Sequence, residues 1–185
     1  MSLTNPEVLA RTGGREIKAI VFGAEQIAAR VAELGAEVTR AYPEGELLLI
    51  GLLKGSFLFL ADLVRHVARP VVVDFMVASS YGDGTVSSGN VRLLYDPATD
   101  LAGKHVVLVE DIVDSGNTLR RLLALLASRR PASLSVCALL DKAAMHSPFE
   151  ELRFVGFDAP PAFLVGYGLD YAEQYRHLPF IADLA

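Results

Sequence analysis

The sequence predicts an α/β fold in which helices flank a central parallel sheet. Short, continuous runs of Val, Ile and Leu recur along the chain, and such runs suit strands that are covered on both faces. Segments with a helical spacing of apolar residues alternate with these runs, as expected for an α/β domain. The predicted strands occupy residues 17–22, 47–53, 71–77, 106–109, 134–140 and 163–165.

The segments between the strands place their apolar residues on one helical face. The first helix carries Ile27, Val31 and Leu34. The second begins near Ser56 and turns inward Phe57, Leu60, Leu63, Val64 and Val67. The third covers residues 117–128 and buries Leu119, Leu122, Leu123 and Leu126. Each helix therefore has an apolar face with which to cover the sheet.

Composition and charge narrow the range of functions. With 185 residues, 52% of them hydrophobic, the chain can bury one core and is predicted to be a single domain, residues 1–185. A net charge of −5, without any run of Lys or Arg, argues against nucleic acid as the main partner. The apolar runs are shorter than the roughly 20 residues that cross a bilayer, and the first residues lack a secretory apolar stretch. We therefore expect a cytoplasmic protein with no membrane partner, whose single cysteine forms no internal disulfide.

The segment 104–119, KHVVLVEDIVDSGNTL, carries the most chemical information. Glu110 and Asp111 come at the carboxyl end of a buried strand, the edge where α/β sheets place their ligands, and can bind hydroxyls or a metal there. Further along, residues 115–118 open a helix, so that free backbone N–H groups and hydroxyls converge as they do in phosphate sites. Alternatively, Asp114 or Ser115 simply caps the helix. Capping does not account for three carboxylates, which are unfavourable beside a phosphate unless a cation or sugar hydroxyls intervene.

This segment resembles the phosphoribosyl pyrophosphate signature of the type I phosphoribosyltransferases, in which two acids precede a D-[ST]-G-x-T turn. The resemblance implies a parallel sheet with a mobile flap and a small hood, formed by the N-terminal residues and the segment after about residue 150. It also implies that Glu110 and Asp111 hold the ribose hydroxyls and that Asp114 faces the base. The 5-phosphate would lie in the turn formed by Ser115, Gly116, Asn117 and Thr118.

Two more segments resemble the hypoxanthine-guanine branch of this family. LLKGSF, residues 52–57, is similar to a loop whose Lys54 and Gly55 contact pyrophosphate through a strained peptide, although a plain strand-to-helix turn explains these residues equally well. The polar segment 79–90, SSYGDGTVSSGN, is similar to the flap, with Ser80 and Tyr81 as its closing pair. Its glycines and serines favour such a flap over the alternative of an exposed hairpin.

The resemblance places purine recognition in two further segments. Lys142, in LLDK, would read the oxygen at position 6 of the base and reject adenine, whose amino group is itself a donor. In AFLVGYGLDYAEQYRHLP, residues 162–179, Phe163 would stack on the purine and the Leu164 backbone would hydrogen-bond to it. Asp170, in the same purine-binding segment, would bind magnesium, and Arg176 would meet the pyrophosphate. Without the resemblance, Lys142 and Arg176 would be solvated charges and Phe163 a core residue.

One position departs from the family pattern. Many relatives place an arginine four residues after the base-reading lysine, whereas this sequence has His146, within KAAMHSPF. A histidine donates to a phosphate when protonated, but its charge fades near neutral pH. His146 is therefore not among the predicted site residues.

Taken together, the resemblance implies a purine salvage enzyme. It would transfer the phosphoribosyl group from phosphoribosyl pyrophosphate to hypoxanthine or guanine, giving IMP or GMP and pyrophosphate. Magnesium, with Asp170, Glu110 and Asp111 as its ligands, would assist departure of the pyrophosphate, and Asp114 would take the proton from the purine. We expect a homodimer or homotetramer. The alternatives are a xanthine-preferring transferase and a regulatory protein that keeps this fold to sense nucleotides.

Overall fold

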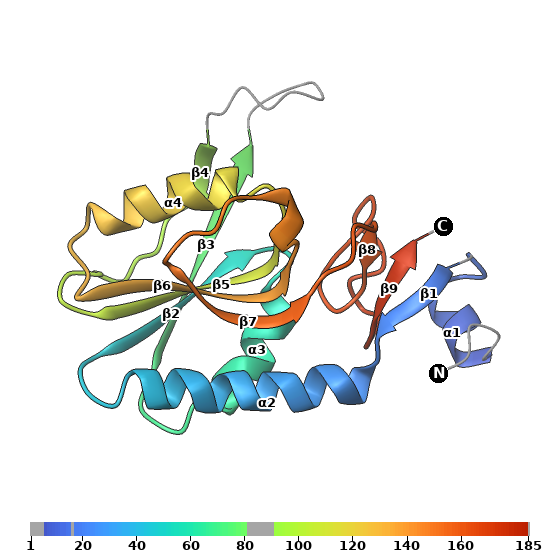
Figure 1. The fold of residues 1–185 in the computed structure, drawn as a ribbon, viewed down its shortest axis with the longest axis horizontal. Helices are drawn as coiled ribbons and strands as arrows, with labels where there is room; N and C mark the ends of the chain where they lie inside the picture. Colours follow the sequence, from blue (N-terminus) through green and yellow to red (C-terminus); the bar gives the residue numbers. More distant parts are fainter. Residues whose placement is uncertain (1–5, 16, 81–90, 185) are drawn as a thin grey trace.

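Within residues 6–15, 17–80 and 91–184, which the computed structural model describes, six strands form the large sheet (Figure 1). Their spatial order is β4-β3-β2-β5-β6-β7, and only the β3–β4 pair is antiparallel. The predicted parallel sheet is confirmed. The strands are β2 (Leu47–Leu53), β3 (Val72–Ser80), β4 (Val91–Tyr95), β5 (His105–Val113), β6 (Ser133–Asp141) and β7 (Leu152–Asp158).

Helices cover both faces of this sheet, which explains why its central strands are apolar throughout (Figure 1). On one face, α2 (Ala24–Ala41) and α3 (Phe57–Arg65) pack against Leu47 and Leu49 of β2. On the other face, α4 (Asn117–Ala127) shares a core with Leu48 and Ile50. Because successive strand residues point to opposite faces, an unbroken apolar run is needed to fill both cores.

The predicted helices are confirmed, with two corrections to the second one: Val67 is buried but lies beyond the end of α3, and Phe57 does not point inward. Residues 27, 31 and 34 are buried in α2, and the four predicted leucines are buried in α4. Phe57 was expected to point inward, but it is 40% exposed. It is the first residue of α3, where the chain leaves the sheet edge, so the side chain lies outside the helix–sheet contact.

A smaller antiparallel sheet has the order β1-β9-β8. Two of the predicted strands, β1 (Ile17–Phe22) and β8 (Leu164–Val165), belong to this sheet and not to the parallel one, because both pair with β9 (Ile181–Leu184). The sequence reading missed β4, β7 and β9, and also the short helix α1 (Pro6–Arg11). The implied hood included everything after about residue 150, whereas β7 lies in the large sheet.

The strand order places two loops at one functional edge. From β2 the chain runs through α3 to β3 on one side, and from β5 it runs through α4 to β6 on the other side. The two connections therefore diverge between β2 and β5, which pair with each other. Ligands of open α/β sheets bind at the carboxyl ends of strands beside such a divergence. The loops after β2 and β5 contain the two predicted phosphate-binding segments, Lys54–Gly55 and the turn before α4.

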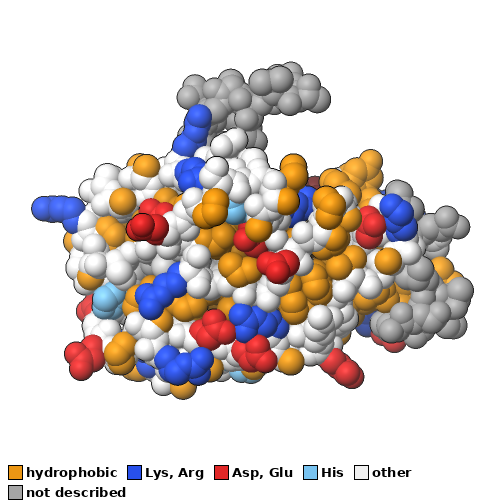
Figure 2. All heavy atoms as spheres, viewed as in Figure 1, with side chains coloured by type: hydrophobic (Ala, Val, Ile, Leu, Met, Phe, Trp, Pro, Cys, Tyr) orange, Lys and Arg blue, Asp and Glu red, His pale blue; other side chains and the backbone are white. Residues whose placement is uncertain are grey.

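The surface in Figure 2 carries acidic and basic side chains interspersed, without a broad field of one sign on this face. Nucleic-acid binding depends on such a basic field. Among the helices of the described ranges, none is long and apolar enough to span a membrane.

Candidate active site

A cavity of about 530 Å³ opens at the carboxyl edge of the large sheet, between the loops that follow β2 and β5. It is lined by residues from five separate parts of the chain, and it collects most of the residues that the sequence predicted for one site. The predicted residues in its lining are Lys54, Gly55, Glu110, Asp111, Asp114, Ser115, Gly116, Asn117, Thr118, Asp170 and Arg176.

The turn before α4 presents backbone donors to this cavity. Gly116 is the N-cap, with a left-handed φ of 70°, so neither Asp114 nor Ser115 occupies the capping position. The Ser115 hydroxyl oxygen lies 3.5 Å from the Asn117 nitrogen, too far for a strong cap. Glycine accepts this backbone conformation readily. The first-turn N–H groups, which have no partner within the helix, are therefore available for an anion.

The two adjacent acids lie beyond the last residue of β5 that pairs with β2, Val109. Burial raises the pKa of Glu110 well above its usual range, and the neighbouring Asp111 raises it further. Burial also raises the pKa of Asp111, although the Ile112 N–H donates a 2.9 Å hydrogen bond to it. The Oε2 atom of Glu110 is buried and has no hydrogen-bond partner among the residues that the structure describes. Such an atom calls for an explanation, and a ligand hydroxyl would supply one.

The loop after β2 packs directly on Asp111. A Cβ atom at Gly55 would lie 1.6 Å from the Asp111 carboxylate, so only glycine fits here. The preceding peptide bond, between Leu53 and Lys54, is cis. Lys54 lines the cavity together with the acidic pair.

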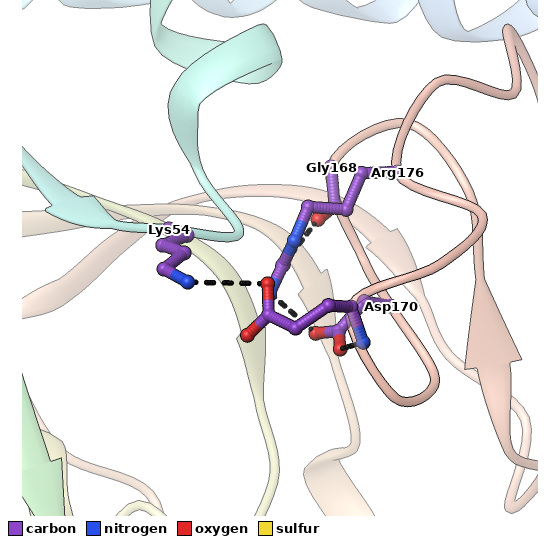
Figure 3. A network of polar contacts seen from close by, with 5 residues as sticks. Lys54, Gly168, Asp170 and Arg176 are labelled. Carbon is purple, nitrogen blue, oxygen red and sulfur yellow. Dashed lines mark hydrogen bonds and ion pairs between the residues drawn. The ribbon is translucent and has the colours of Figure 1, made fainter.

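Figure 3 shows Lys54 and Arg176 converging from two loops. Glu173 lies between them, with its carboxylate 3.1 Å from Lys54 Nζ and 3.3 Å from Arg176 Nη2. Arg176 also contacts Asp170 at 2.8 Å and donates a 2.7 Å hydrogen bond to the Gly168 carbonyl. Carboxylates therefore contact both of the cations that the resemblance assigns to pyrophosphate.

This second loop has an unusual backbone. Ala172, Glu173 and Tyr175 all have positive φ angles, between 51° and 74°. Non-glycine residues rarely adopt such angles, and clusters of them occur at ligand sites. Tyr167, with a φ of 49°, donates a 2.5 Å hydrogen bond to Asp62 of α3. The bond joins this loop to the helix that follows Lys54.

The three carboxylates predicted as metal ligands do not form one preformed cage. Within the described part of the chain, no group of three or more His, Cys, Asp or Glu side chains is placed to hold a metal ion. Asp170 lies beside Arg176, whereas Glu110 and Asp111 lie on β5.

Of the predicted purine-binding residues, Asp170 lies in the lining of the cavity, whereas Lys142, Phe163 and Leu164 lie outside it. Lys142 follows β6, and its Nζ atom lies 3.4 Å from Asp114 Oδ2. Phe163 is 54% exposed and meets Tyr171 edge to face at 5.6 Å, so it is neither a core residue nor buried. Leu164 is buried in β8. Asp114 thus lies in the cavity lining and also contacts Lys142 outside it.

The predicted flap pair is largely outside the structure. Ser80 ends β3, and Tyr81 lies outside the described residues. The choice between a closing flap and a hairpin stays a prediction.

Sequence reasoning missed three members of the site: Glu173, Gly168 and the Tyr167–Asp62 pair. Glu173 resembles an ordinary exposed helix charge, and only the folded loop brings it between two cations. The Gly-Tyr-Gly run, residues 166–168, was a usable signal, because closely spaced glycines often mark a backbone that must adopt positive φ.

Comparison with known proteins agrees with this geometry. A family model described as "Phosphoribosyl transferase domain" matches residues 19–172. The chain belongs to the phosphoribosyltransferase family.

Individual relatives are closely similar. The chain is 50% identical over 161 residues to hypoxanthine phosphoribosyltransferase of Salmonella typhimurium, a match that covers 86% of this chain and 90% of that protein. It is 45% identical to hypoxanthine-guanine phosphoribosyltransferase of Bacillus subtilis, covering 91% of this chain and 94% of the relative. The crystal structure of a hypoxanthine-guanine phosphoribosyltransferase from Bacillus anthracis superposes with a TM-score of 0.87 at 44% identity, covering 92% of this chain and 100% of that one.

Proposed function

We propose that the protein transfers the 5-phosphoribosyl group from phosphoribosyl pyrophosphate to hypoxanthine or guanine, giving IMP or GMP and pyrophosphate. The observation that carries this proposal is the phosphate-binding turn at Gly116 beside the Glu110–Asp111 pair, in a chain of this family. The similarity to the Salmonella enzyme supports the choice of base.

The charges of the cavity suit the two ends of the substrate. The turn from Ser115 to Thr118 holds the 5-phosphate on backbone N–H groups. The ribose hydroxyls hydrogen-bond to Glu110 and Asp111, and one of them supplies the partner that Glu110 Oε2 lacks. Lys54 and Arg176 neutralise the departing pyrophosphate, once it displaces Glu173 from between them.

The residues at the pyrophosphate end fit a magnesium ion. Magnesium prefers oxygen ligands and is usually bound by one or two carboxylates together with substrate phosphates. The carboxylate of Asp170 and the lack of a three-ligand cage in the described residues match this mode. Asp170 would hold the ion, with Glu110 and Asp111 near the ribose end. When bound, magnesium would neutralise charge that develops on the pyrophosphate.

The base is handled by Asp114 and Lys142. Asp114 takes the proton from N7 of the purine, which keeps N9 nucleophilic towards the anomeric carbon. Lys142 donates to the 6-oxygen of the base, and its 3.4 Å ion pair with Asp114 keeps the two side chains at the same end of the cavity. Phe163 stacks on the ring, and the backbone of Leu164 hydrogen-bonds to its edge. The large exposed fraction of Phe163 suits an open base site that is completed by the ligand.

A panel of bases tests the proposal. The protein is incubated with phosphoribosyl pyrophosphate, magnesium and hypoxanthine, guanine, xanthine, adenine or uracil in turn, and nucleotide and pyrophosphate are measured. We expect product from hypoxanthine and guanine, little from xanthine, and none from adenine or uracil. Product mainly from xanthine would select the xanthine-preferring alternative. No product from any base would favour the regulatory alternative. Sedimentation of the same preparation would test the expected homodimer or homotetramer.

A further inference from the structure

The residue that departs from the family pattern, His146, lies directly behind the phosphate turn. Its side chain is only 3% exposed. A Cβ atom at Gly116 would lie 3.7 Å from His146 Cβ and 3.7 Å from the ring of Phe149, so the loop after β6 packs on the start of α4. A solvated surface histidine would not be buried in this way.

Both ring nitrogens of His146 face hydrogen-bond acceptors. Nε2 lies 2.7 Å from the Asp141 carboxylate, and Nδ1 lies 3.1 Å from the carbonyl oxygen of Ser147. Neither an ionised carboxylate nor a carbonyl can donate a proton. A neutral imidazole has one donor and one acceptor nitrogen, so either tautomer would set a lone pair against an oxygen. Only the imidazolium form satisfies both contacts.

The surrounding charges support this form. Burial lowers the pKa of His146, but the hydrogen bonds to Asp141 and to the Ser147 carbonyl outweigh burial, and the net shift is upward. The charged groups that face the ring are Asp141, from the end of β6, and Arg120, from α4. Arg120 opposes the positive charge, but its guanidinium is engaged over the Phe149 ring at 4.7 Å and by the Ser147 carbonyl.

Asp141 connects His146 to the base site. Asp141 is the last residue of β6, and its side chain is 10% exposed. The next residue is Lys142, whose backbone N–H donates a 2.9 Å bond to Val113 and whose Nζ atom pairs with Asp114. Because Lys142 directly follows Asp141 in the chain, a shift of Asp141 also shifts Lys142.

From these contacts we infer that His146 is a positioning residue for purine recognition: as a buried imidazolium it fixes Asp141, and through it Lys142, against the first turn of α4. The inference rests on the proposed function of Lys142. His146 lies outside the lining of the cavity. Its loss of charge at high pH would leave one ring nitrogen facing an oxygen without a proton, and the hold on Lys142 would loosen.

Two substitutions of His146 separate the effect of its positive charge from the effect of its packing. His146→Arg keeps a positive charge at every pH, and arginine is the residue that many relatives carry here. His146→Gln keeps an amide donor for Asp141 but has no charge. For wild type and both variants, KM for hypoxanthine, KM for phosphoribosyl pyrophosphate and kcat are measured from pH 6 to 8.5. Ionisation of the base itself affects all three proteins equally, so they are compared at each pH.

We expect His146→Gln to raise KM for hypoxanthine about tenfold at pH 6, because a neutral amide donor replaces a hydrogen bond between charged groups. KM for phosphoribosyl pyrophosphate should change less than about twofold. The wild-type KM for hypoxanthine should rise towards the His146→Gln value as pH increases, and that of His146→Arg should not. Identical pH profiles for wild type and His146→Arg, or equal changes in both KM values, would overturn the inference.

A measurement on the unmodified protein keeps the inference testable if a variant fails to fold. The ring nitrogen shifts of His146 are followed by NMR as pH is raised, with the protein free of ligands. We expect His146 to titrate above the ordinary histidine pKa of about 6.5. Titration at or below that value would overturn the inference. This readout needs no turnover, so failure of the proposed transferase activity would be recognised separately.

Discussion

A Cβ atom at Gly168 would lie 2.0 Å from the carbonyl oxygen of Gly55, so the loops that carry Lys54 and Arg176 meet through glycine backbone. Gly168 also has a φ of 102°, which side-chain-bearing residues rarely adopt. We expect Gly168→Ala to push the two loops apart. KM for phosphoribosyl pyrophosphate should rise about tenfold or more, because misplaced charges lose most of their benefit.

Gly103→Ala is a matched control for this substitution. Gly103 has a φ of 72°, and a Cβ atom there would have no neighbour within 4 Å. Its alanine variant should lose stability through backbone strain, about 1 to 2 kcal/mol, with unchanged kinetics. Thermal unfolding and KM are measured for both. If Gly168→Ala also kept its KM, the contact with Gly55 would have no role in binding.

Glu173 holds the two cations that the proposed substrate needs. We expect Glu173→Gln to lower KM for phosphoribosyl pyrophosphate about two- to fivefold, because exposed ion pairs are weak and the substrate would no longer have to break two of them. Glu33→Gln is the control, since Glu33 is an equally exposed partner of Arg30 on α2. A higher KM in Glu173→Gln would show instead that Glu173 orients Lys54 and Arg176 productively.

Much of the fold could be predicted because the central strands are continuous apolar runs, which indicate burial on both faces of the sheet. The alternation of Leu47 and Leu49 towards one core, and of Leu48 and Ile50 towards the other, requires an unbroken apolar run. The small sheet could not be assigned in this way. A run such as residues 17–22 looks the same whether it joins a parallel or an antiparallel sheet, and the four residues of β9 are too few to show a pattern.

The site was predictable where a local motif sets the geometry and not where contacts are distant in sequence. Gly116 follows from the turn that a phosphate requires, and it lies in the cavity as expected. Glu173 and Lys54 are 119 residues apart. The acceptors of His146 are close in sequence, Asp141 at five residues and Ser147 at one, but the sequence does not show that the loop turns the ring towards them.

Lys142 should contribute to binding of the purine base and little to binding of phosphoribosyl pyrophosphate. We expect Lys142→Ala to raise KM for hypoxanthine and guanine by about tenfold or more, since the 6-oxygen loses a charged donor. KM for phosphoribosyl pyrophosphate should change much less. Lys104→Ala, which removes a similarly covered lysine at the opposite edge of the sheet, is the control and should leave both constants unchanged. Equal losses for the two substrates would contradict the assigned role.

Asp114 should act in catalysis more than in folding. Its side chain is half exposed and forms an ion pair with Lys142 at 3.4 Å. We expect Asp114→Asn to preserve the fold and phosphoribosyl pyrophosphate binding but to slow nucleotide synthesis by roughly 10²-fold or more, which is typical for loss of a proton acceptor. Asp100→Asn, at the far edge of the sheet, is the control. Unchanged turnover in Asp114→Asn would reject its role as the base.

The protonated state of His146 also predicts how stability varies with pH. Because the pKa of His146 is raised in the folded protein, its contribution is fully present below the unfolded pKa of about 6.5 and is lost as pH rises through the folded pKa. Each unit of that elevation corresponds to about 1.4 kcal/mol. Urea unfolding of wild type and His146→Gln at pH 5.5 and 8.5 measures the effect. The stability difference between the two should shrink at the higher pH. A difference that stayed constant or grew with pH would mean that His146 is neutral in the folded protein.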